Sequence, residues 1–312
     1  MTSQTASSRP FVAAVDWGTT SLRVWLLDET GQVLSETRSD QGMAKLSRGE
    51  FGAVLERELA ALRAPSGLPA MICGMAGARQ GWKEIRYLEV PVAVDAILEA
   101  ATPVEAAARP VWILPGLCQR APVADVMRGE ETQIAGAVAR FAAGDYLLCL
   151  PGTHSKWVQV KDATVTGFRT FLTGEMFSLL CEHSILRHSV GSSRQADGQS
   201  PVFRERLRTV LENPSALPSS LFSIRAEGLL GEFPPDAAAA ALSGYLIGAE
   251  IAGARSQFAT AGNEVILIAS GGLADLYSAA LEEAGMTTTV IDAETAVRTA
   301  LFEAARFKLR GS

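Results

Sequence analysis

Cysteine and histidine are scarce in this chain. Its 312 residues include only Cys73, Cys118, Cys149 and Cys181, and three histidines. The cysteines are far apart, without the CxxC pairs of a metal or redox site or the density of a small secreted scaffold, so they indicate buried thiols in a reducing compartment. His183 and His188 have no third spaced ligand, which argues against a zinc site.

Long apolar runs and an excess of basic charge are also missing. No run reaches the roughly 18 apolar residues of a membrane span, because Tyr245 and Glu250 interrupt the Ala-rich segment after Asp236. Residues 1–10 lack the apolar core of a signal peptide, and we expect them to be disordered. The net charge is −6, with no basic stripe. We therefore expect a cytoplasmic protein without nucleic-acid or membrane partners.

The bulk composition is that of a globular enzyme. Hydrophobic residues make up 48% of the chain and charged residues 20%, which excludes a mostly disordered protein. Because 312 residues exceed the size at which single cores stop growing, two domains are the better expectation.

Two similar units of strand, Gly-Thr turn, strand, turn and strand occur about half a chain apart. The first turn, Asp16-Trp17-Gly18-Thr19-Thr20-Ser21, lies between strand-like residues 11–15 and 24–27, and the second, Pro151-Gly152-Thr153-His154-Ser155, between 147–150 and 156–160. Backbone N–H groups and hydroxyls in such turns bind phosphate, and glycine permits close approach. Neither is a Walker loop, since both turns enter strands instead of helices. The repeat predicts two half-molecules that each offer a turn to one anionic ligand.

Strand-like and helix-like segments alternate along the whole chain. We expect further strands at 32–35, 71–74, 111–114, 165–168, 265–268 and 289–291, and helices at 49–63, 131–141, 174–187, 236–258, from 273, and at 294–306. This alternation predicts an α/β sandwich in each half. We place the domain boundary after residue 142, giving an N-terminal domain of 11–142 and a C-terminal domain of 143–312.

Three motifs together resemble the sugar kinase, actin and heat-shock chaperone superfamily of ATPases. Asp16 to Thr20 resembles its first phosphate motif, Pro151 to Thr153 its second, and Ile268-Ala269-Ser270-Gly271-Gly272 its adenosine motif. The resemblance implies two ribonuclease-H-like (actin-like ATPase) domains with a nucleotide cleft between them.

Five blocks in order resemble more closely the 2-dehydro-3-deoxygalactonokinase family. They are residues 15–23, 74–82, 127–133, 150–157 and 171–175. That family implies phosphorylation of the terminal 6-hydroxyl of 2-dehydro-3-deoxy-D-galactonate by ATP with Mg²⁺, giving the 6-phosphate and ADP in galactonate catabolism. The alternatives are a kinase for another sugar or sugar acid, and a non-catalytic ATP-binding module of the same fold.

The nucleotide roles follow from the resemblance and from phosphate chemistry. Gly18, Thr19 and Thr20 would hold the terminal phosphates, Gly152 and Thr153 would close from the other side, and Gly271 and Gly272 would let adenine or ribose pass close to the backbone. Asp16 would organise Mg²⁺ through water, because this ion favours carboxylate oxygens and keeps much of its hydration. The alternative for Asp16 is a turn cap.

A carboxylate that accepts the hydroxyl proton is expected just before the second phosphate hairpin. Related sugar kinases place an Asp at the start of a helix there, whereas this chain has Gly129-Glu130-Glu131. The assignment of the base stays open between Glu130 and Glu131. Alternatively, both residues only stabilise the first turn of the helix.

The carboxylate and hydroxyls of the sugar acid call for Arg and planar polar partners. Arg79 and Gln80, with Trp82 as a wall, and Arg128 are candidates, although a lone Arg is more often solvated. Gly42, Met43, Thr173, Gly174 and Glu175 also match the family and are expected to line the cleft. The sequence leaves the oligomeric state open, a homodimer included.

Overall fold

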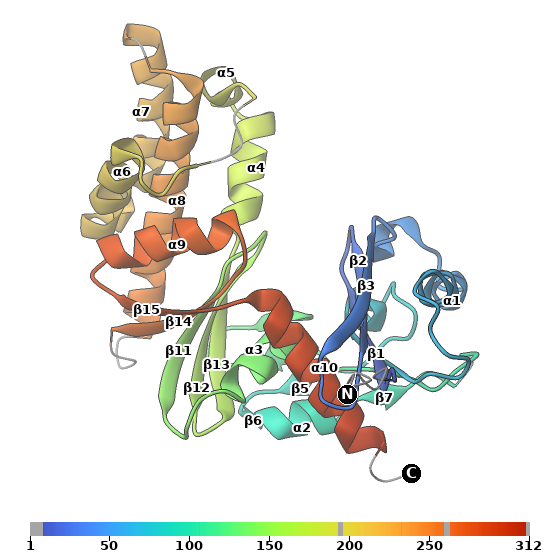
Figure 1. Ribbon diagram of the computed structural model, residues 1–312. Coiled ribbons are helices and arrows are strands. Elements are labelled where there is room, and N and C mark those ends of the chain that lie inside the picture. The colour runs from blue at the N-terminus through green and yellow to red at the C-terminus, as the bar shows by residue number, and fades with distance from the viewer. Residues whose placement is uncertain (1–8, 106, 193–195, 232, 259–262, 310–312) are drawn as a thin grey trace, which may run out of the picture. The chain divides into compact units, whose positions relative to one another are not determined.

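The computed structural model describes residues 9–105, 107–192, 196–231, 233–258 and 263–309 (Figure 1). Its contacts divide the chain into two compact units. Unit 1 contains the described residues up to Ala142, Ala163–Val165 and the last helix; unit 2 contains those of Ala143–Asp162 and Thr166–Asp292. Residues 1–8 of the expected disordered tail lie outside the described residues.

The main sheet of unit 1 has the strand order β3-β2-β1-β4-β8-β7. Its strands are β1 (Val12–Trp17), β2 (Leu22–Leu27), β3 (Val33–Ser39), β4 (Ala70–Gly74), β7 (Thr102–Pro103) and β8 (Val111–Ile113). β1 is antiparallel to β2 and parallel to β4, and β4 is parallel to β8. Because β1 is central and nearly all its residues are buried, Asp16 is held in a rigid strand next to the Gly-Thr turn.

Helices and short strands complete unit 1. They are η1 (Met43–Lys45), α1 (Phe51–Ala61), η2 (Met75–Gly77), β5 (Leu88–Glu89), β6 (Val92–Ala93), α2 (Val94–Glu99), β9 (Leu117–Gln119), β10 (Asp125–Met127) and α3 (Glu130–Val138). α1 buries the face expected from its spacing, with Phe51, Val54, Leu55 and Leu59 in the core. β10, β9 and β5 form a small second sheet.

The last helix, α10 (Ala293–Leu309), belongs to unit 1. The expected boundary after residue 142 coincides with the first division between the units, but assigning residues from 293 onward to the C-terminal domain was wrong. The reason is packing, since α10 contacts α3, α2, β1 and β4. Gly136 of α3 comes so close to α10 that a Cβ there would lie 1.8 Å from the Ala296 carbonyl oxygen.

Unit 2 repeats the strand order of unit 1. Its strands are β11 (Asp145–Leu150), β12 (Ser155–Lys161), β13 (Thr164–Phe171), β14 (Glu264–Ile268) and β15 (Thr287–Ile291), in the order β15-β14-β11-β12-β13. β11 is antiparallel to β12 and parallel to β14, and β14 is parallel to β15. β13 begins in unit 1, where Thr164 and Val165 pair with β6. The expected duplication is therefore confirmed as a shared topology.

The helices of unit 2 are α4 (Thr173–His183), α5 (Arg187–Val190), α6 (Pro201–Glu212), α7 (Leu217–Leu230), α8 (Pro235–Gln257) and α9 (Gly272–Glu283), with a short η3 (Pro214–Ala216). The single helix expected over 174–187 is divided, because Ser184 is extended after α4. α6 and α7 pack on α8 (Figure 1). α8 is long and apolar enough to cross a membrane, but 78% of its most apolar window is buried inside the protein, as in a core helix.

Candidate active site

The first Gly-Thr turn joins β1 to β2 and presents its hydroxyl residues to solvent. Thr19 and Thr20 are exposed, and Gly18 is half-buried. The Gly18 N–H donates to the Ser21 carbonyl at 2.9 Å, which closes the turn. The two threonine side chains at its tip are therefore accessible to a ligand, as their predicted role in phosphate binding requires.

Gly42 and Met43 support this turn from the neighbouring loop. The Met43 N–H donates to the Gly18 carbonyl at 3.0 Å, and the next N–H along the chain donates to the Thr19 carbonyl at 2.9 Å. A Cβ on Gly42 would lie 2.3 Å from the carbonyl carbon of Thr20, so this approach requires glycine. The structure thus gives both residues a role in holding the turn, while their predicted contact with substrate stays a prediction.

Asp16 lies near the end of β1, next to the turn. Its Oδ2 accepts a hydrogen bond from Arg23 Nη1 at 3.1 Å, and its side chain is 22% exposed. Desolvation raises the pKa of the Asp16 carboxyl, although the Arg23 charge acts in the opposite direction. A bound cation would stabilise the ionised form of this carboxylate further.

Cys73 connects Asp16 with the start of α3. It is the register partner of Asp16 on the neighbouring parallel strand, and its Sγ lies 3.8 Å from Asp16 Oδ1. Burial raises the pKa of the Cys73 thiol well above its usual range, and the charges of Asp16 and Glu131 raise it further. Two of the carboxylates predicted from sequence to be catalytic therefore lie on one face of unit 1, around a neutral thiol.

Glu130 and Glu131 begin α3 but occupy different environments. Glu131 is fully buried; its Oε2 accepts from the Gly129 N–H at 2.7 Å and its Oε1 from the Thr132 hydroxyl at 2.9 Å. Burial, and secondarily the Glu130 charge, raise the pKa of Glu131 to about 8. Glu130 is only partly buried and accepts from the Arg128 N–H at 3.2 Å. Only Glu130 retains surface that a substrate could reach.

The glycine-rich loop after β4 exposes Arg79 and Gln80. Arg48 fixes the loop by donating to the Arg79 carbonyl at 2.6 Å and to the Gly81 carbonyl at 3.2 Å. Trp82 packs in the core of unit 1, with its ring centroid 6.3 Å from that of Trp17, and it also lines a surface pocket beside Arg48. Arg79 and Gln80 are thus available to a ligand. Trp82 packs against the core of unit 1 and also lines the surface pocket.

Arg128 is held under the same loop. Its Nη2 donates to the Ile85 carbonyl at 2.7 Å, and its guanidinium lies 4.4 Å from the centroid of the Tyr87 ring. Among the described residues, its buried Nε and Nη1 have no hydrogen-bond partner. Such orphaned donors are unusual in a folded interior, so Arg128 stays a candidate for binding an anionic group.

The second Gly-Thr turn joins β11 to β12 in unit 2 and is packed against the start of α4. A Cβ on Gly174 would lie 2.4 Å from the Gly152 carbonyl oxygen, and the Glu175 N–H donates to the Thr153 carbonyl at 2.9 Å. The Glu175 carboxylate also pairs with His154. The structure therefore brings Gly174 and Glu175, predicted to line the cleft, into contact with the predicted phosphate turn.

Gly152, Gly271 and Gly272 have open space where a side chain would be, as does Gly285 elsewhere in unit 2. Among the described residues, chain neighbours and the local helix backbone apart, no atom lies within 4 Å of a Cβ built on Gly152, Gly271 or Gly272. Gly271 also has φ +58° and ψ −146°, a conformation that favours glycine, immediately before α9. Exposed backbone at these positions fits the predicted close passage of a phosphate or nucleoside.

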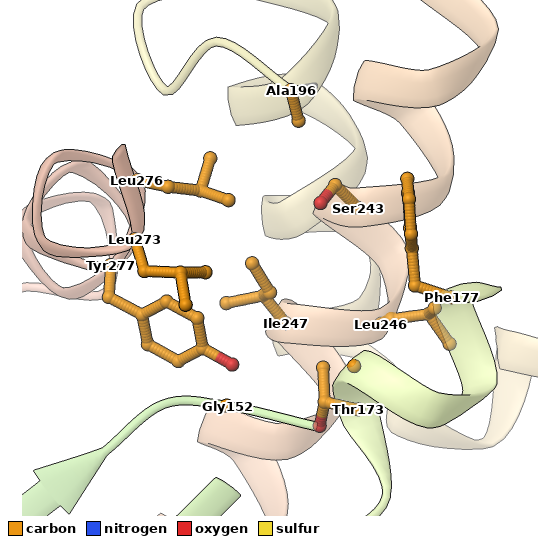
Figure 2. Close-up of a pocket in the computed structure, with 11 residues that line it drawn as sticks. Gly152, Thr173, Phe177, Ala196, Ser243, Leu246, Ile247, Leu273, Leu276 and Tyr277 are labelled. Atoms are coloured by element: carbon orange, nitrogen blue, oxygen red, sulfur yellow. The ribbon is translucent and has the colours of Figure 1, made fainter. Parts of the chain in front are cut away.

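A cavity of about 130 Å³ lies between the second Gly-Thr turn and helices α4, α8 and α9 (Figure 2). Its lining is mostly apolar and comes from α4, α8 and α9; it comprises Gly152, Thr173, Gly174, Phe177, Ala196, Ser243, Leu246, Ile247, Leu273, Leu276 and Tyr277. A mostly apolar lining with a few polar groups is typical of small-molecule pockets. An aromatic base would contact the leucine and isoleucine side chains, with the turn glycine at one end.

The described residues contain no group of three or more His, Cys, Asp or Glu side chains that could hold a metal ion. The donor set at Asp16 is one partly accessible carboxylate. This fits Mg²⁺, which proteins commonly bind through one or two carboxylates together with water and substrate phosphates.

Comparisons with known proteins agree with this arrangement. The sequence profile of the family described as 2-keto-3-deoxy-galactonokinase matches residues 16–304. A probable 2-dehydro-3-deoxygalactonokinase of Rhizobium meliloti is 48% identical over 95% of this chain and 97% of its own. The 2-dehydro-3-deoxygalactonokinase of Escherichia coli is 37% identical over 91% of this chain and 93% of its own.

One solved structure is similar over nearly the whole chain. It is the crystal structure of a Sinorhizobium meliloti protein named as a candidate 2-dehydro-3-deoxygalactonokinase, with a TM-score of 0.91 and 47% identity, covering 95% of this chain and 98% of that one. The expected α/β kinase fold with a repeated mixed sheet is confirmed in both units.

Proposed function

This chain belongs to the 2-keto-3-deoxy-galactonokinase family and is a kinase, and we propose that it phosphorylates the 6-hydroxyl of 2-dehydro-3-deoxy-D-galactonate with ATP in galactonate catabolism. The substrate oxygen forms a bond to the γ-phosphorus as the bond to the ADP oxygen breaks, and the hydroxyl proton leaves to a base. The position of Asp16 near the end of β1, next to an accessible Gly-Thr turn and beside Cys73, carries the proposal.

Each Gly-Thr turn is a phosphate-binding element of its own unit. Thr19 and Thr20 of unit 1 offer hydroxyls to phosphate, and Gly152 and Thr153 of unit 2 offer backbone N–H groups and a hydroxyl. The base occupies the apolar cavity of unit 2. The open space over Gly152, Gly271 and Gly272 supports this proposal.

Asp16 would hold Mg²⁺ through water. When bound, this ion neutralises negative charge on the phosphates as phosphoryl transfer proceeds. Arg23 keeps the Asp16 carboxylate in place through its 3.1 Å contact. The β1 backbone, buried on both sides of Asp16, keeps this geometry from relaxing.

Glu130 accepts the proton of the 6-hydroxyl. A general base must come within hydrogen-bond reach of the proton that it removes, and the Glu131 carboxylate has no exposed surface, whereas Glu130 is partly exposed. Glu131 binds the Gly129 N–H and the Thr132 hydroxyl, so its role is to fix the first turn of α3. These contacts orient Glu130, the residue before it.

The sugar acid is recognised by unit 1. Arg79 and Gln80 are exposed on a loop that Arg48 immobilises, and Arg128 has unpaired donors beneath that loop within the described part of the chain. A guanidinium that binds the carboxylate in a bidentate manner would select sugar acids over neutral sugars. Trp82 supplies an apolar wall.

We propose a cytoplasmic enzyme with small-molecule partners. The four cysteines are all free, which suits a reducing compartment. A homodimer is compatible with this function, and gel filtration with light scattering would test it.

The deciding experiment measures ADP release with ATP and Mg²⁺ on 2-dehydro-3-deoxy-D-galactonate, its gluconate epimer and several neutral sugars. We expect strong turnover on the galactonate compound and weak turnover on neutral sugars. Turnover on another compound alone would keep the kinase and change its substrate. No turnover on any compound, with intact ATP binding, would favour a non-catalytic nucleotide-binding module.

A further inference from the structure

Glu250 is a buried carboxylate in the middle of the apolar helix α8. Glu250 is 2% exposed to solvent. Its Oε1 accepts from Trp157 Nε1 at 2.9 Å, and its Oε2 accepts from the Tyr277 hydroxyl at 2.8 Å. The Thr173 and Ser155 hydroxyls also hydrogen-bond with it. One side chain thus gathers partners from β12, α4 and α9.

A carboxylate in this position is costly unless it is well hydrogen-bonded. Burial disfavours the charged form, and the four hydrogen bonds offset part of that penalty. An apolar residue would satisfy the core of unit 2 without this cost. Core packing alone therefore does not explain this hydrogen-bond network, and its position in unit 2 indicates its role.

Two members of the network also line the nucleotide cavity. Thr173 and Tyr277 lie in its wall, and Figure 2 shows the Tyr277 hydroxyl and Thr173 on the side of the cavity near Gly152. The Ser155 hydroxyl lies 3.1 Å from the Tyr277 hydroxyl and follows the second Gly-Thr turn by two residues. Glu250 is thus bonded both to the cavity wall and to the first residue of β12.

We propose that Glu250 is a positioning residue for the nucleotide, which fixes the Tyr277 ring and the Gly152-Thr153 turn relative to each other. The proposal rests on the proposed function, because it takes the cavity as the base site and the turn as a phosphate site. Base and phosphates are covalently joined in one ligand and both must be placed at once, so loosening either wall weakens binding of the whole. Glu250 itself does not contact the nucleotide.

The binding of ADP without sugar acid tests this role directly. Calorimetry on Glu250→Ala should give an ADP dissociation constant raised by about tenfold or more, because two cavity-wall hydroxyls lose their acceptor. Glu250→Gln retains one carbonyl acceptor and should fall between this variant and the unchanged protein. In the kinase assay, KM for ATP should rise in parallel, while KM for the sugar acid should change less than about twofold.

A matched control separates positioning from general stability. Val160 is fully buried on β12, outside the network, and Val160→Ala should lower the melting temperature without changing ADP affinity. Tyr277→Phe keeps the ring but removes the hydroxyl, so combining it with Glu250→Gln should give a non-additive change in ADP affinity. The Trp157 indole should also report the loss of its acceptor by a shift in fluorescence emission.

The outcomes distinguish the inference from its premise. Glu250 and Tyr277 variants that bind ADP as tightly as the unchanged protein overturn the positioning role alone. Loss of affinity in the Val160 control to the same extent also overturns it, because general destabilisation then suffices. An unchanged protein that binds no nucleotide overturns the cavity assignment and this inference with it.

Discussion

Arg23 and Asp16 face each other across the β1–β2 hairpin, with Nη1 3.1 Å from Oδ2. Arg23 also lies 3.8 Å from Glu294 of α10, which binds Arg38 through both of its oxygens. The carboxylate proposed to hold Mg²⁺ is therefore fixed by an ion-pair network and not by the turn alone.

Asp16→Asn should abolish most turnover while the protein stays folded. The amide keeps the shape of the side chain but loses the charge that would hold Mg²⁺, so kcat should fall by about 10³-fold. ADP release and thermal unfolding measure the two effects. Asp28→Asn is a matched control, because Asp28 accepts hydrogen bonds within a remote turn and its loss should leave kcat unchanged. Near-normal turnover of Asp16→Asn would refute the phosphate-site assignment.

Glu130→Gln and Glu131→Gln should differ in kinetics. Removing a general base costs about 10²–10⁴ in rate, so Glu130→Gln should lower kcat by that order with little change in either KM. Glu131→Gln should be milder, because the pKa of about 8 leaves this carboxyl mostly protonated at neutral pH. Steady-state kinetics of both variants give the answer, and equal, mild effects would remove the proposed base.

The stability of the protein should depend on pH through Glu131. Its pKa is about 8 when folded and 4.5 as the ordinary value, so the folded state binds more protons than the unfolded state between these values. Stability from this group is complete below pH 4.5 and is lost as pH rises toward 8. Glu131→Gln lacks this dependence. The melting temperature of the variant minus that of the unchanged protein should therefore increase as pH rises. A constant difference would contradict the buried, protonated carboxyl.

Gly272→Ala should weaken nucleotide binding without destabilising the fold. In the part of the chain that the structure describes, a Cβ at Gly272 meets no atom within 4 Å beyond its chain neighbours and its own helix backbone, whereas a Cβ at Gly174 would lie 2.4 Å from the Gly152 carbonyl oxygen. Alanine is also the better helix former by about 1 kcal/mol, so Gly272→Ala should melt no lower than the unchanged protein. Gly174→Ala is the contrasting variant, which should lose stability. Unchanged ADP affinity in Gly272→Ala would argue against nucleoside passage there.

Arg79→Gln should raise KM for the sugar acid by about tenfold, as expected for one charged hydrogen bond to a carboxylate. KM for ATP and the melting temperature should stay constant because Arg79 is exposed. Arg128→Gln should instead lower the melting temperature, since Arg128 supports the Ile85 carbonyl and the Tyr87 ring. Unchanged sugar-acid kinetics in Arg79→Gln would leave Arg128 as the carboxylate partner.

The sequence predicted the repeated units because their signals are local. Strand runs around Asp16-Trp17-Gly18-Thr19 and Pro151-Gly152-Thr153 are short, apolar and interrupted by glycine, and each became a hairpin of the expected type. The spacing of apolar residues in α1 likewise fixed its buried face. These patterns do not depend on distant parts of the chain.

Contacts between distant segments could not be predicted from spacing. Cys73 beside Asp16 depends on the register of two parallel strands, and the partners of Glu250 come from β12, α4 and α9. The sequence analysis identified Glu250 only as a charge that interrupts an apolar run. Gly42 looked like a candidate for substrate contact, whereas its closest neighbours are backbone atoms of the first turn.

The return of α10 to unit 1 sets an order of events during synthesis. A ribosome delivers the chain from its N-terminus, so strands β11 to β15 of unit 2 are all synthesised before α10. Until then α3 has no partner for Gly136, and Glu294 is absent beside Arg23. All the residues of unit 2 are therefore made before those of unit 1 are complete, and the Asp16 site gains its final ion-pair support only when α10 has emerged.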